Sequence, residues 1–441
     1  MHDYQMNKGN QKFTSPNKNE RLAVLLPGLG AVSTTLIAGV EAVRRNLALP
    51  VGSYTQMGKL NLENNALETV SGLFPFATLD QLVFGGWDIF PENCYDTAFK
   101  NNIIDKSLLT QLYEYLSSIN PMPAVFDQKF VPRLNPKISK IAKTKMDYAE
   151  MLRKDINDFM QNKKCSRAVM LWCASTETYN PVIDIHRNLD EFERGLKENN
   201  PCISPTQIYA YAALCENVPF INGSPNLSVE TPAIQECAKD FKIPIAGSDF
   251  KTGQTLLKTI LAPGLRKRLL GVSGWYSSNI LGNRDGEVLD DPSAFRSKEI
   301  TKTSVLNNIF SAEEYPDLYN DLYHMVRIHY YPPRGDNKES WDNIDIFGWL
   351  GYPMQIKVNF LAKDSILAAP IALDLVLLTD LAARTGLTGI QDWLGYYFKS
   401  PYTTNGDIAE HDLNIQFDKF ETMLRKIHKS GTFTEKILVN D

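Results

Sequence analysis

The amino-acid sequence predicts an α/β protein built around a parallel sheet. Its 441 residues are 43% hydrophobic, which is enough for a large core spread over about two to three domains. An apolar strand at 22–27 is followed by a glycine turn and a helical pattern. Four later apolar segments end in small or polar residues, at 82–88, 168–176, 219–226 and 243–250. Ligands bind beyond the carboxyl ends of parallel strands, so these segments predict one long crevice.

The turn after the first strand resembles the start of a dinucleotide-binding unit. Gly28 and Gly30 fill the first two positions of the G-x-G-x-x-G pattern, but Ser33 stands at the third. Such an incomplete pattern fits an ordinary strand–turn–helix equally well. The acidic residue expected about 20 positions later is missing, so Asp88 is the candidate for the ribose contact. A turn or helix-capping role for Asp88 is equally compatible with the sequence.

The pattern changes after about residue 255, which predicts a second domain inserted into the first. We expect a discontinuous Rossmann-type domain at 21–255 and 368–441, with an α/β domain inserted at 256–367. Strands of a second layer are expected in the inserted domain, at 271–283, 324–333 and 354–363.

Two further segments have a simple interpretation. The polar residues 1–20 contain no apolar core for secretion and predict a disordered tail. The stretch Ile366–Leu378 is too short to span a bilayer and predicts a buried helix. Asp364 or Ser365 is expected to cap this helix, with Pro370 in its first turn.

Composition argues against several classes of protein. The formal net charge is -5, and no basic stripe is present, so a nucleic-acid partner is not expected. The six cysteines form no CxxC pair, and reduced cysteines in a cytoplasmic protein are expected. The six histidines are dispersed, and His324 and His329 lack the spacing of a paired zinc site, so no metal site is predicted.

The segment 243–265 is the most informative one for ligand binding. A strand ends at Gly247, and helical periodicity begins near Thr255. Thr252, Gly253 and Gln254 therefore lie at a helix N-terminus, where free N–H groups and the helix dipole favour a phosphate. The order Lys-Thr-Gly differs from that of a P-loop. An anion site is favoured here over a plain helix cap.

The next polar segments are less decisive. Asn283 and Asp285 lie in a turn of sequence NILGNRDG. Lys298 and Lys302 fall four residues apart on one predicted helical face, where like charges repel. A bound phosphate would offset this repulsion, but solvent and Glu299 are the simpler explanation.

Three other residues are unremarkable when each is taken alone. Lys338 and Lys399 are compatible with surface lysines, and Lys399 also with a helix C-terminal cation. Asp364 is compatible with a plain N-cap.

Taken together and in order, these segments resemble the inositol-3-phosphate synthase (myo-inositol-1-phosphate synthase) family. The resemblance covers about residues 22–400 and rests on GLGAVS, TQMG, GWDI, LWCAST, NGSPN, GSDFKTGQT, NILGNRDG, FRSKEITKTS, GDNK and KDSILAAPIALDL. It implies an NAD-dependent isomerase that converts D-glucose 6-phosphate to 1D-myo-inositol 3-phosphate. The implied steps are oxidation at C5, enolisation, intramolecular aldol closure and re-reduction, without net redox change.

The resemblance also implies roles for individual residues. The catalytic residues would be Lys298, Lys338 and Lys399, with Asp249 and Asp364 orienting them and relaying protons. The substrate phosphate would be held by Thr252, Gly253, Gln254, Lys302 and Asn283. The cofactor would contact Gly28, Gly30, Ala31, Val32, Ser33, Asp88, Ala174, Ser175, Thr176, Asp249 and Asp285.

Some features depart from the family pattern and leave alternatives open. Gly30-Ala31-Val32-Ser33 replaces the common Gly-Gly-Asn-Asn, and Arg284 stands where a neutral or acidic residue is frequent. An NAD-dependent sugar-phosphate dehydrogenase with net redox and a catalytically inactive NAD-binding regulatory protein are the alternatives. The resemblance implies a cytoplasmic homotetramer, with no membrane partner, in inositol and phospholipid biosynthesis.

Overall fold

The computed structural model describes residues 20–62, 67–289, 305–404 and 407–430. Its largest unit is a seven-stranded parallel sheet with the strand order β13-β8-β7-β6-β1-β4-β5. The strands are β1 (Leu22–Pro27), β4 (Leu82–Asp88), β5 (Met122–Pro123), β6 (Arg167–Trp172), β7 (Phe220–Asn222), β8 (Pro244–Gly247) and β13 (Gly389–Ile390). The predicted α/β class is confirmed, and all five predicted strands of this sheet are present.

Helices cover both faces of the parallel sheet, as expected for strands that are buried on both sides. They are α1 (Ala31–Arg44), α4 (Cys94–Asn101), α5 (Lys106–Gln111), α6 (Tyr113–Ser117), α7 (Lys145–Lys163), α8 (Leu189–Lys197), α9 (Pro205–Cys215), α10 (Pro232–Asp240), α15 (Asp364–Arg384) and α16 (Leu413–Ser430). One core cluster joins α1, α15 and α16 to the sheet, and a second joins α7, α9 and α10 to the opposite face. Short pieces complete this unit: α2 (Tyr54–Met57), β2 (Lys59–Asn61), β3 (Leu67–Thr69), α3 (Val70–Leu73) and the 3-10 turn η5 (Asp392–Tyr397).

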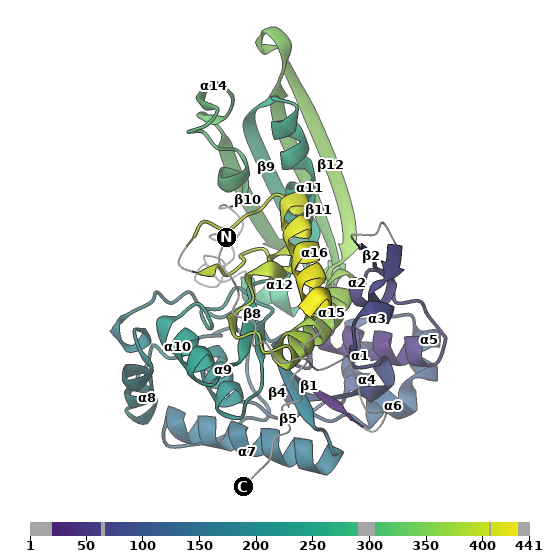
Figure 1. The fold of residues 1–441 in the computed structure, drawn as a ribbon, viewed down its shortest axis with the longest axis vertical. Helices are drawn as coiled ribbons and strands as arrows, with labels where there is room; N and C mark the ends of the chain where they lie inside the picture. The colour runs from purple at the N-terminus through teal and green to yellow at the C-terminus, as the bar shows by residue number, and fades with distance from the viewer. Residues whose placement is uncertain (1–19, 63–66, 290–304, 405–406, 431–441) are drawn as a thin grey trace.

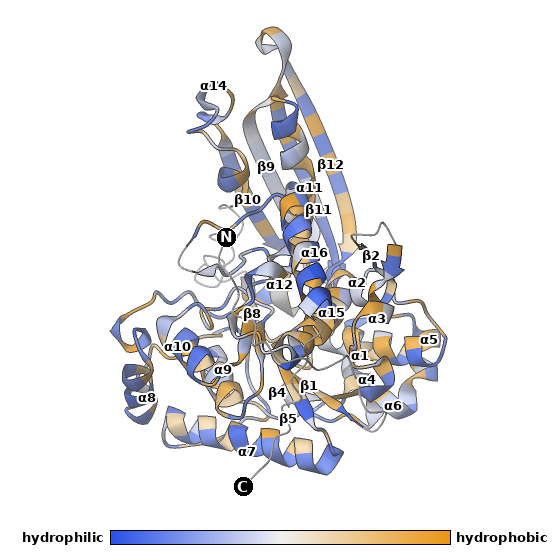
Figure 2. Cartoon of the chain, in the orientation of Figure 1, coloured by the Kyte–Doolittle hydropathy of each residue, from blue (hydrophilic) through white to orange (hydrophobic). Residues whose placement is uncertain are grey.

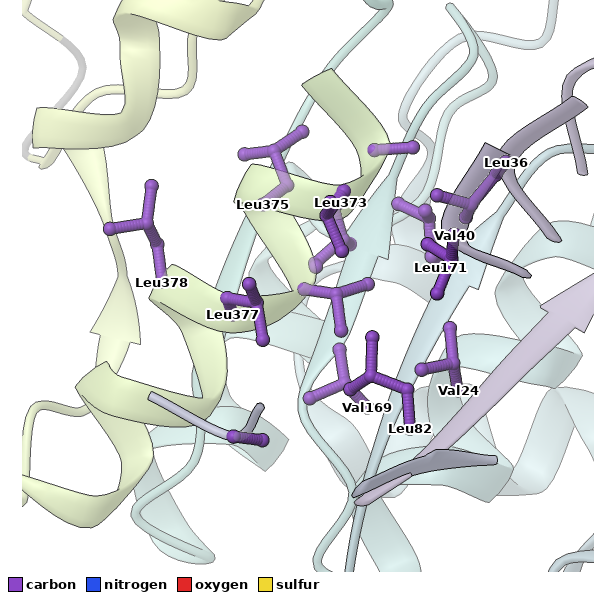
Figure 3. Packing of buried hydrophobic residues seen from close by; sticks show 14 of the residues in the cluster. Val24, Leu36, Val40, Leu82, Val169, Leu171, Leu373, Leu375, Leu377 and Leu378 are labelled. Atoms are coloured by element: carbon purple, nitrogen blue, oxygen red, sulfur yellow. The ribbon is translucent and has the colours of Figure 1, made fainter. Parts of the chain in front are cut away.

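Helix α15 is the central helix of the first core cluster. Its leucines pack against α1 and against strands β1, β4 and β6, as Figure 3 shows. Among the described residues it is the one helix long and apolar enough to cross a membrane, yet 72% of its most apolar stretch is buried inside the protein. Hydrophobic residues are concentrated in this region in Figure 2. The predicted buried helix is confirmed, but it begins at Asp364, so Pro370 lies in its second turn and not in the first.

A second sheet projects from the first, with the order β10-β9-β11-β12 (Figure 1). Its strands are β9 (Gly271–Leu281), β10 (Tyr323–Tyr330), β11 (Asn337–Phe347) and β12 (Pro353–Lys363), and α11 (Gly253–Lys267), α12 (Arg284–Leu289) and α14 (Pro316–Tyr319) accompany them. Strands β9 and β10 are parallel, whereas β11 is antiparallel to both β9 and β12. Three of these strands match the predicted ones. Strand β11 was not predicted.

The connections between the two sheets bring together the starts of helix α11, strand β11 and helix α15. Helix α11 directly follows the loop after β8, strand β11 begins near that loop, and β12 runs directly into α15. Gly253 at the start of α11 and Asp364 at the start of α15 are close in space although they lie 111 positions apart in the chain (364 minus 253).

Candidate active site

A pocket lies at the carboxyl edge of the parallel sheet, where β1 has β4 on one side and β6 on the other. The strand order changes direction at this point, which is where open α/β sheets bind ligands. Thirteen of the predicted site residues line this one pocket: Gly28, Gly30, Ala31, Val32, Asp88, Ala174, Ser175, Thr176, Asp249, Thr252, Asn283, Asp364 and Lys399.

The turn after β1 is closely packed against the turn after β6. Gly28 has φ +90°, and a Cβ atom built on it would lie 2.5 Å from the Cα atom of Ala174. Gly30 is the N-cap of α1, no side chain caps this helix, and a Cβ atom on Gly30 would meet nothing within 4 Å among the described residues. The turn thus leaves open space at a helix N-terminus, which fits the pyrophosphate of a dinucleotide.

Ser33 does not line the pocket. It is fully buried, and its hydroxyl donates a hydrogen bond of 2.6 Å to the carbonyl oxygen of Gly28. The side chain therefore supports the glycine turn from behind. The serine at the third position of the glycine pattern acts on the backbone of this turn.

The position of Asp88 is compatible with both roles that the sequence left open, a turn role and a ribose contact. Its Oδ1 atom accepts a hydrogen bond of 3.0 Å from the backbone N–H of Phe90, which is the turn role. Asp88 also lines the pocket at the end of β4, on the side of the sheet next to β1. One carboxylate can hold the turn and face a ribose.

Two lysine–aspartate pairs lie at the junction of the sheets. The Nζ atom of Lys399 is 3.0 Å from Oδ1 of Asp249, and both side chains are about 5% exposed or less. The Nζ atom of Lys338 is 3.0 Å from Oδ2 of Asp364. Each aspartate holds one ammonium group in place with little contact to water, so the charge stays localised.

Backbone hydrogen bonds fix the loop that carries Asp249. This residue has φ +60°, in the left-handed region, which aspartate adopts more readily than most residues. Its carbonyl oxygen accepts a bond of 2.7 Å from the N–H of Lys399, and Ser248 and Ser400 exchange bonds of 2.8 and 3.1 Å. The loop after β8 and the segment after η5 therefore hold the buried pair from both sides.

The N-terminus of α11 opens toward the second lysine–aspartate pair. Thr252 is the N-cap, and its side chain does not cap the helix. Gly253 has φ +55°, and a Cβ atom there would lie 3.5 Å from Oδ1 of Asp364 and 3.9 Å from Nζ of Lys338. The predicted anion-binding turn and the pair are therefore neighbours in space.

Two further acidic residues line the pocket without having been predicted. Asp336 accepts a bond of 2.8 Å from Nδ2 of Asn283, and burial raises the pKa of its carboxyl group. Glu177 accepts a bond of 2.9 Å from the N–H of Thr206, and burial raises its pKa to about 7. The available signals were position alone: Asp336 lies two residues before Lys338, and Glu177 directly follows the predicted turn after β6.

The family model described as myo-inositol-1-phosphate synthase matches residues 22–425. The chain belongs to this family. Inositol-3-phosphate synthase 1 of Bacteroides thetaiotaomicron is 53% identical over 92% of this chain and 95% of that protein. Inositol-3-phosphate synthase 1 of rice is 33% identical over 94% of this chain and 87% of that protein. The crystal structure of inositol-3-phosphate synthase from Caenorhabditis elegans superposes with a TM-score of 0.87 at 26% identity, covering 95% of this chain and 88% of that chain.

Membership of the family decides several predictions. The family, the α/β fold, the enzyme class and NAD as cofactor are confirmed. The net-redox dehydrogenase and the inactive regulatory protein are not favoured, since close relatives carry the name of the synthase.

For three of the predicted site residues the structure describes no side chain. Lys298 and Lys302 fall in 290–304, outside the residues that the structure describes. Asp285 lies on α12, and its side chain is not among those described. Of the three predicted catalytic lysines, Lys399 lines the pocket, and Lys338 forms an ion pair with Asp364, which also lines it.

Proposed function

We propose that the chain converts D-glucose 6-phosphate to 1D-myo-inositol 3-phosphate, with these residues in the roles described below. NAD supplies the acceptor for the hydride from C5 of the sugar and returns the hydride at the end of the reaction. The observation that carries the proposal is the convergence of a glycine turn, an open helix N-terminus and two lysine–aspartate pairs on one pocket. This arrangement provides cofactor, phosphate and proton-transfer sites side by side.

The phosphate of the substrate binds at the N-terminus of α11. Gly253 and Gln254 offer backbone N–H groups and the positive end of the helix dipole. The N–H of Thr252 donates a bond of 3.0 Å to the carbonyl oxygen of Phe250, so Thr252 contributes its hydroxyl group in our proposal. The contacts of Asn283 and the charge of Lys302 complete this site in our proposal. Support comes from the positive φ of Gly253 and from the uncapped helix start.

The lysines carry protons and positive charge during the reaction. Oxidation at C5 needs a base for the hydroxyl proton, and enolisation and aldol closure need a cation beside the developing oxyanion. Lys399 and Lys338 serve these steps together with Lys298. Asp249 and Asp364 orient the ammonium groups and take part in proton relay. A desolvated lysine is suited to this work because its pKa responds readily to its surroundings.

NAD binds along the carboxyl ends of β1, β4 and β6. Gly28, Gly30, Ala31 and Val32 face its pyrophosphate, with Ser33 holding their turn, and Asp88 faces the ribose. The other contacts in our proposal are Ala174, Ser175, Thr176, Asp249 and Asp285. The packing of Gly28 against Ala174 supports a fixed platform for this cofactor.

We also propose that the enzyme is a cytoplasmic homotetramer that supplies inositol for phospholipid synthesis, assembled through the inserted domain at 256–367. Support for assembly comes from strand β12, which among the described strands pairs with β11 alone and is exposed along much of its length. The turn before it, at the far end of the projecting sheet in Figure 1, exposes Trp349 (88%) and Leu350 (77%). Exposed strand edges and apolar patches of this kind are typical of interaction surfaces.

The proposal is tested by NMR of the purified chain with glucose 6-phosphate and a catalytic amount of NAD. We expect an inositol monophosphate to accumulate while the NADH absorbance stays nearly constant, because the hydride is returned in each turnover. Stoichiometric NADH formation with an oxidised sugar phosphate would show a dehydrogenase instead. Cofactor binding without any product would show the inactive NAD-binding protein.

A further inference from the structure

Helix α11 carries two buried polar side chains that face the second sheet, Gln254 and Lys258. They lie four residues apart, on the same face of the helix. Their hydrogen bonds run to strands β9, β10 and β11. Hydrogen bonds therefore hold the first two turns of α11, which starts at the proposed phosphate site, against the projecting sheet.

The carboxamide of Gln254 is fully engaged with this sheet. Its Nε2 atom donates bonds of 3.1 Å to the carbonyl oxygen of Ser278 and to Oδ2 of Asp342. Its Oε1 atom accepts a bond of 2.5 Å from Nδ2 of Asn279. What Gln254 offers to the pocket is consequently its backbone, and its side chain acts as an anchor.

Asp342 determines which way this carboxamide points. Its Oδ1 atom accepts bonds of 2.8 Å from Nε1 of Trp275 and 2.6 Å from the hydroxyl of Ser277. An ionised carboxylate only accepts hydrogen bonds, so Oδ2 requires a donor from Gln254. The amide nitrogen must then face Asp342, and the amide oxygen must face Asn279.

Lys258 is the second buried group of α11, and it interacts electrostatically with the carboxylate of Asp342. Its Nζ atom is 2.7 Å from Nε2 of His324 and 6.0 Å from the centre of the Trp275 ring. Burial lowers the pKa of Lys258 to about 8, and the nearby carboxylate of Asp342 acts in the opposite direction. A buried charge persists only with such a counter-charge and with hydrogen bonds.

We propose that Asp342 is a positioning residue of the phosphate site and acts through Gln254. The inference rests on the proposed function, because it assumes that the substrate phosphate binds at the start of α11. That turn has a positive φ at Gly253 and no side-chain cap from Thr252, so the anchor at Gln254 determines where its N–H groups point. Hydrogen bonds weaken steeply with misalignment, so a freed carboxamide weakens phosphate binding without touching the reacting atoms.

The test is a kinetic comparison of Asp342→Asn, Gln254→Met and the double variant. An asparagine places a second NH2 group opposite that of Gln254, so we expect the KM for glucose 6-phosphate to rise roughly tenfold with kcat within about threefold. A purely structural role would lower the fraction of active enzyme, and with it kcat, while KM stayed unchanged. That result would overturn the proposal.

The double variant shows whether Asp342 acts through Gln254. If Asp342 acts through Gln254, the KM of the double variant rises no further than that of the single variants, roughly tenfold. Independent effects would multiply to roughly a hundredfold and would overturn the proposal. Asp345→Asn is the matched control, because Asp345 lies on the same strand, is partly exposed and accepts from Asn343 and Gln355. Its KM should equal that of the unchanged enzyme.

Three further outcomes are distinguishable. If Asp342→Asn does not fold, Ser277→Ala removes one donor to the same carboxylate, and KM should rise about two- to threefold; an unchanged KM in Ser277→Ala overturns the proposal. A chain that makes no inositol phosphate at all contradicts the proposed function and this inference together. An active chain whose variants keep their KM contradicts only the role of Asp342.

Discussion

At the scale of single residues, the Lys399–Asp249 pair serves both stability and the proposed chemistry, and the two can be separated. Lys399→Met should lower kcat by about 10²- to 10⁴-fold. It also leaves the buried carboxylate of Asp249 without its cation, which costs about 3–5 kcal/mol of unfolding free energy. The double variant Lys399→Met/Asp249→Asn removes this buried charge, so stability should recover while turnover does not.

Steady-state kinetics and denaturant unfolding check this prediction. Lys419→Met is the control, since the side chain of Lys419 is half-exposed, pairs at 2.8 Å with Asp392 far from the proposed chemistry, and should change turnover little and stability much less than Lys399→Met does. Recovery of turnover in the double variant would remove Lys399 from the mechanism.

The two glycines of the first turn should respond differently to the same substitution. Gly28→Ala places a methyl group 2.5 Å from Ala174 at φ +90°, so we expect a lower melting temperature together with weaker NAD binding. Gly30→Ala places its methyl group in open space at the start of α1, so the fold should keep its melting temperature. NAD affinity should still fall at least about tenfold, because the methyl group occupies the proposed pyrophosphate site.

Thermal unfolding and NAD titration of both variants separate these effects. If Gly30→Ala bound NAD as tightly as the unchanged chain, the pyrophosphate would not lie at this turn.

At the scale of helices and strands, the predictability of each element followed its hydrophobic pattern. Strands β1, β4, β6, β7 and β8 are almost continuously apolar and buried, and all five could be read from the sequence. Strand β11 could not, because its buried face alternates Lys338, Ser340 and Asp342 before Ile344. These buried polar residues have partners on other elements: Lys338 on α15, Ser340 on β12 and Asp342 on α11.

In the candidate site, the backbone motifs could be predicted from the sequence, whereas the side-chain pairs could not. Backbone motifs such as the glycine turn and the helix start have local signatures, and they were found. The pairing of Lys338 with Asp364 and of Lys399 with Asp249 depends on tertiary contacts, and only the family resemblance pointed to these residues. Asp342 has no local signal, because its role arises from two strands, β9 and β11, and a helix, α11, that meet around it.

The buried Lys251 links helix α16 to the loop after β8, and its charge depends on pH. Lys251 lies beside Gln416 of α16 and over the ring of Tyr396, and burial lowers its pKa to about 7, with Glu410 acting in the opposite direction. The unfolded chain keeps its lysine protonated to about pH 10. Between these values the unfolded state binds more protons, so the free energy of unfolding rises with pH.

From pH 7 to pH 9, Lys251→Met should therefore gain about 2 kcal/mol less stability than the unchanged chain. Denaturant unfolding at the two pH values measures this difference, in which the contributions of other groups, including Lys258, cancel. Equal gains in both proteins would show that Lys251 is charged in the folded state across this range.

At the scale of the whole molecule, the site lies where the two sheets meet. The parallel sheet supplies the glycine turn, Asp88 and Asp249, whereas the projecting sheet supplies Lys338 and the start of α15 that carries Asp364. A rotation of one sheet relative to the other would move the proposed NAD site at the ends of β1, β4 and β6 away from Lys338 and Asp364. Contacts that hold the projecting sheet in place therefore matter for the chemistry, which connects the proposed assembly to activity.

The outer strand β12 is where this assembly can be tested without disturbing the fold. Met354 and Leu361 are exposed on it (47% and 64%), so glutamates at both positions should leave the single chain folded. In a tetramer that buries this edge, assembly would remove these introduced charges from water, which is strongly unfavourable. We expect sedimentation to give about four times the chain mass of 49.8 kDa for the unchanged protein and a smaller species for Met354→Glu/Leu361→Glu. Ile141→Glu, at a still more exposed apolar position (88%) in the segment before α7, should leave the tetramer intact. A double variant that still sediments as a tetramer would place the interface elsewhere, and an unchanged chain that sediments as a monomer would contradict the assembly itself.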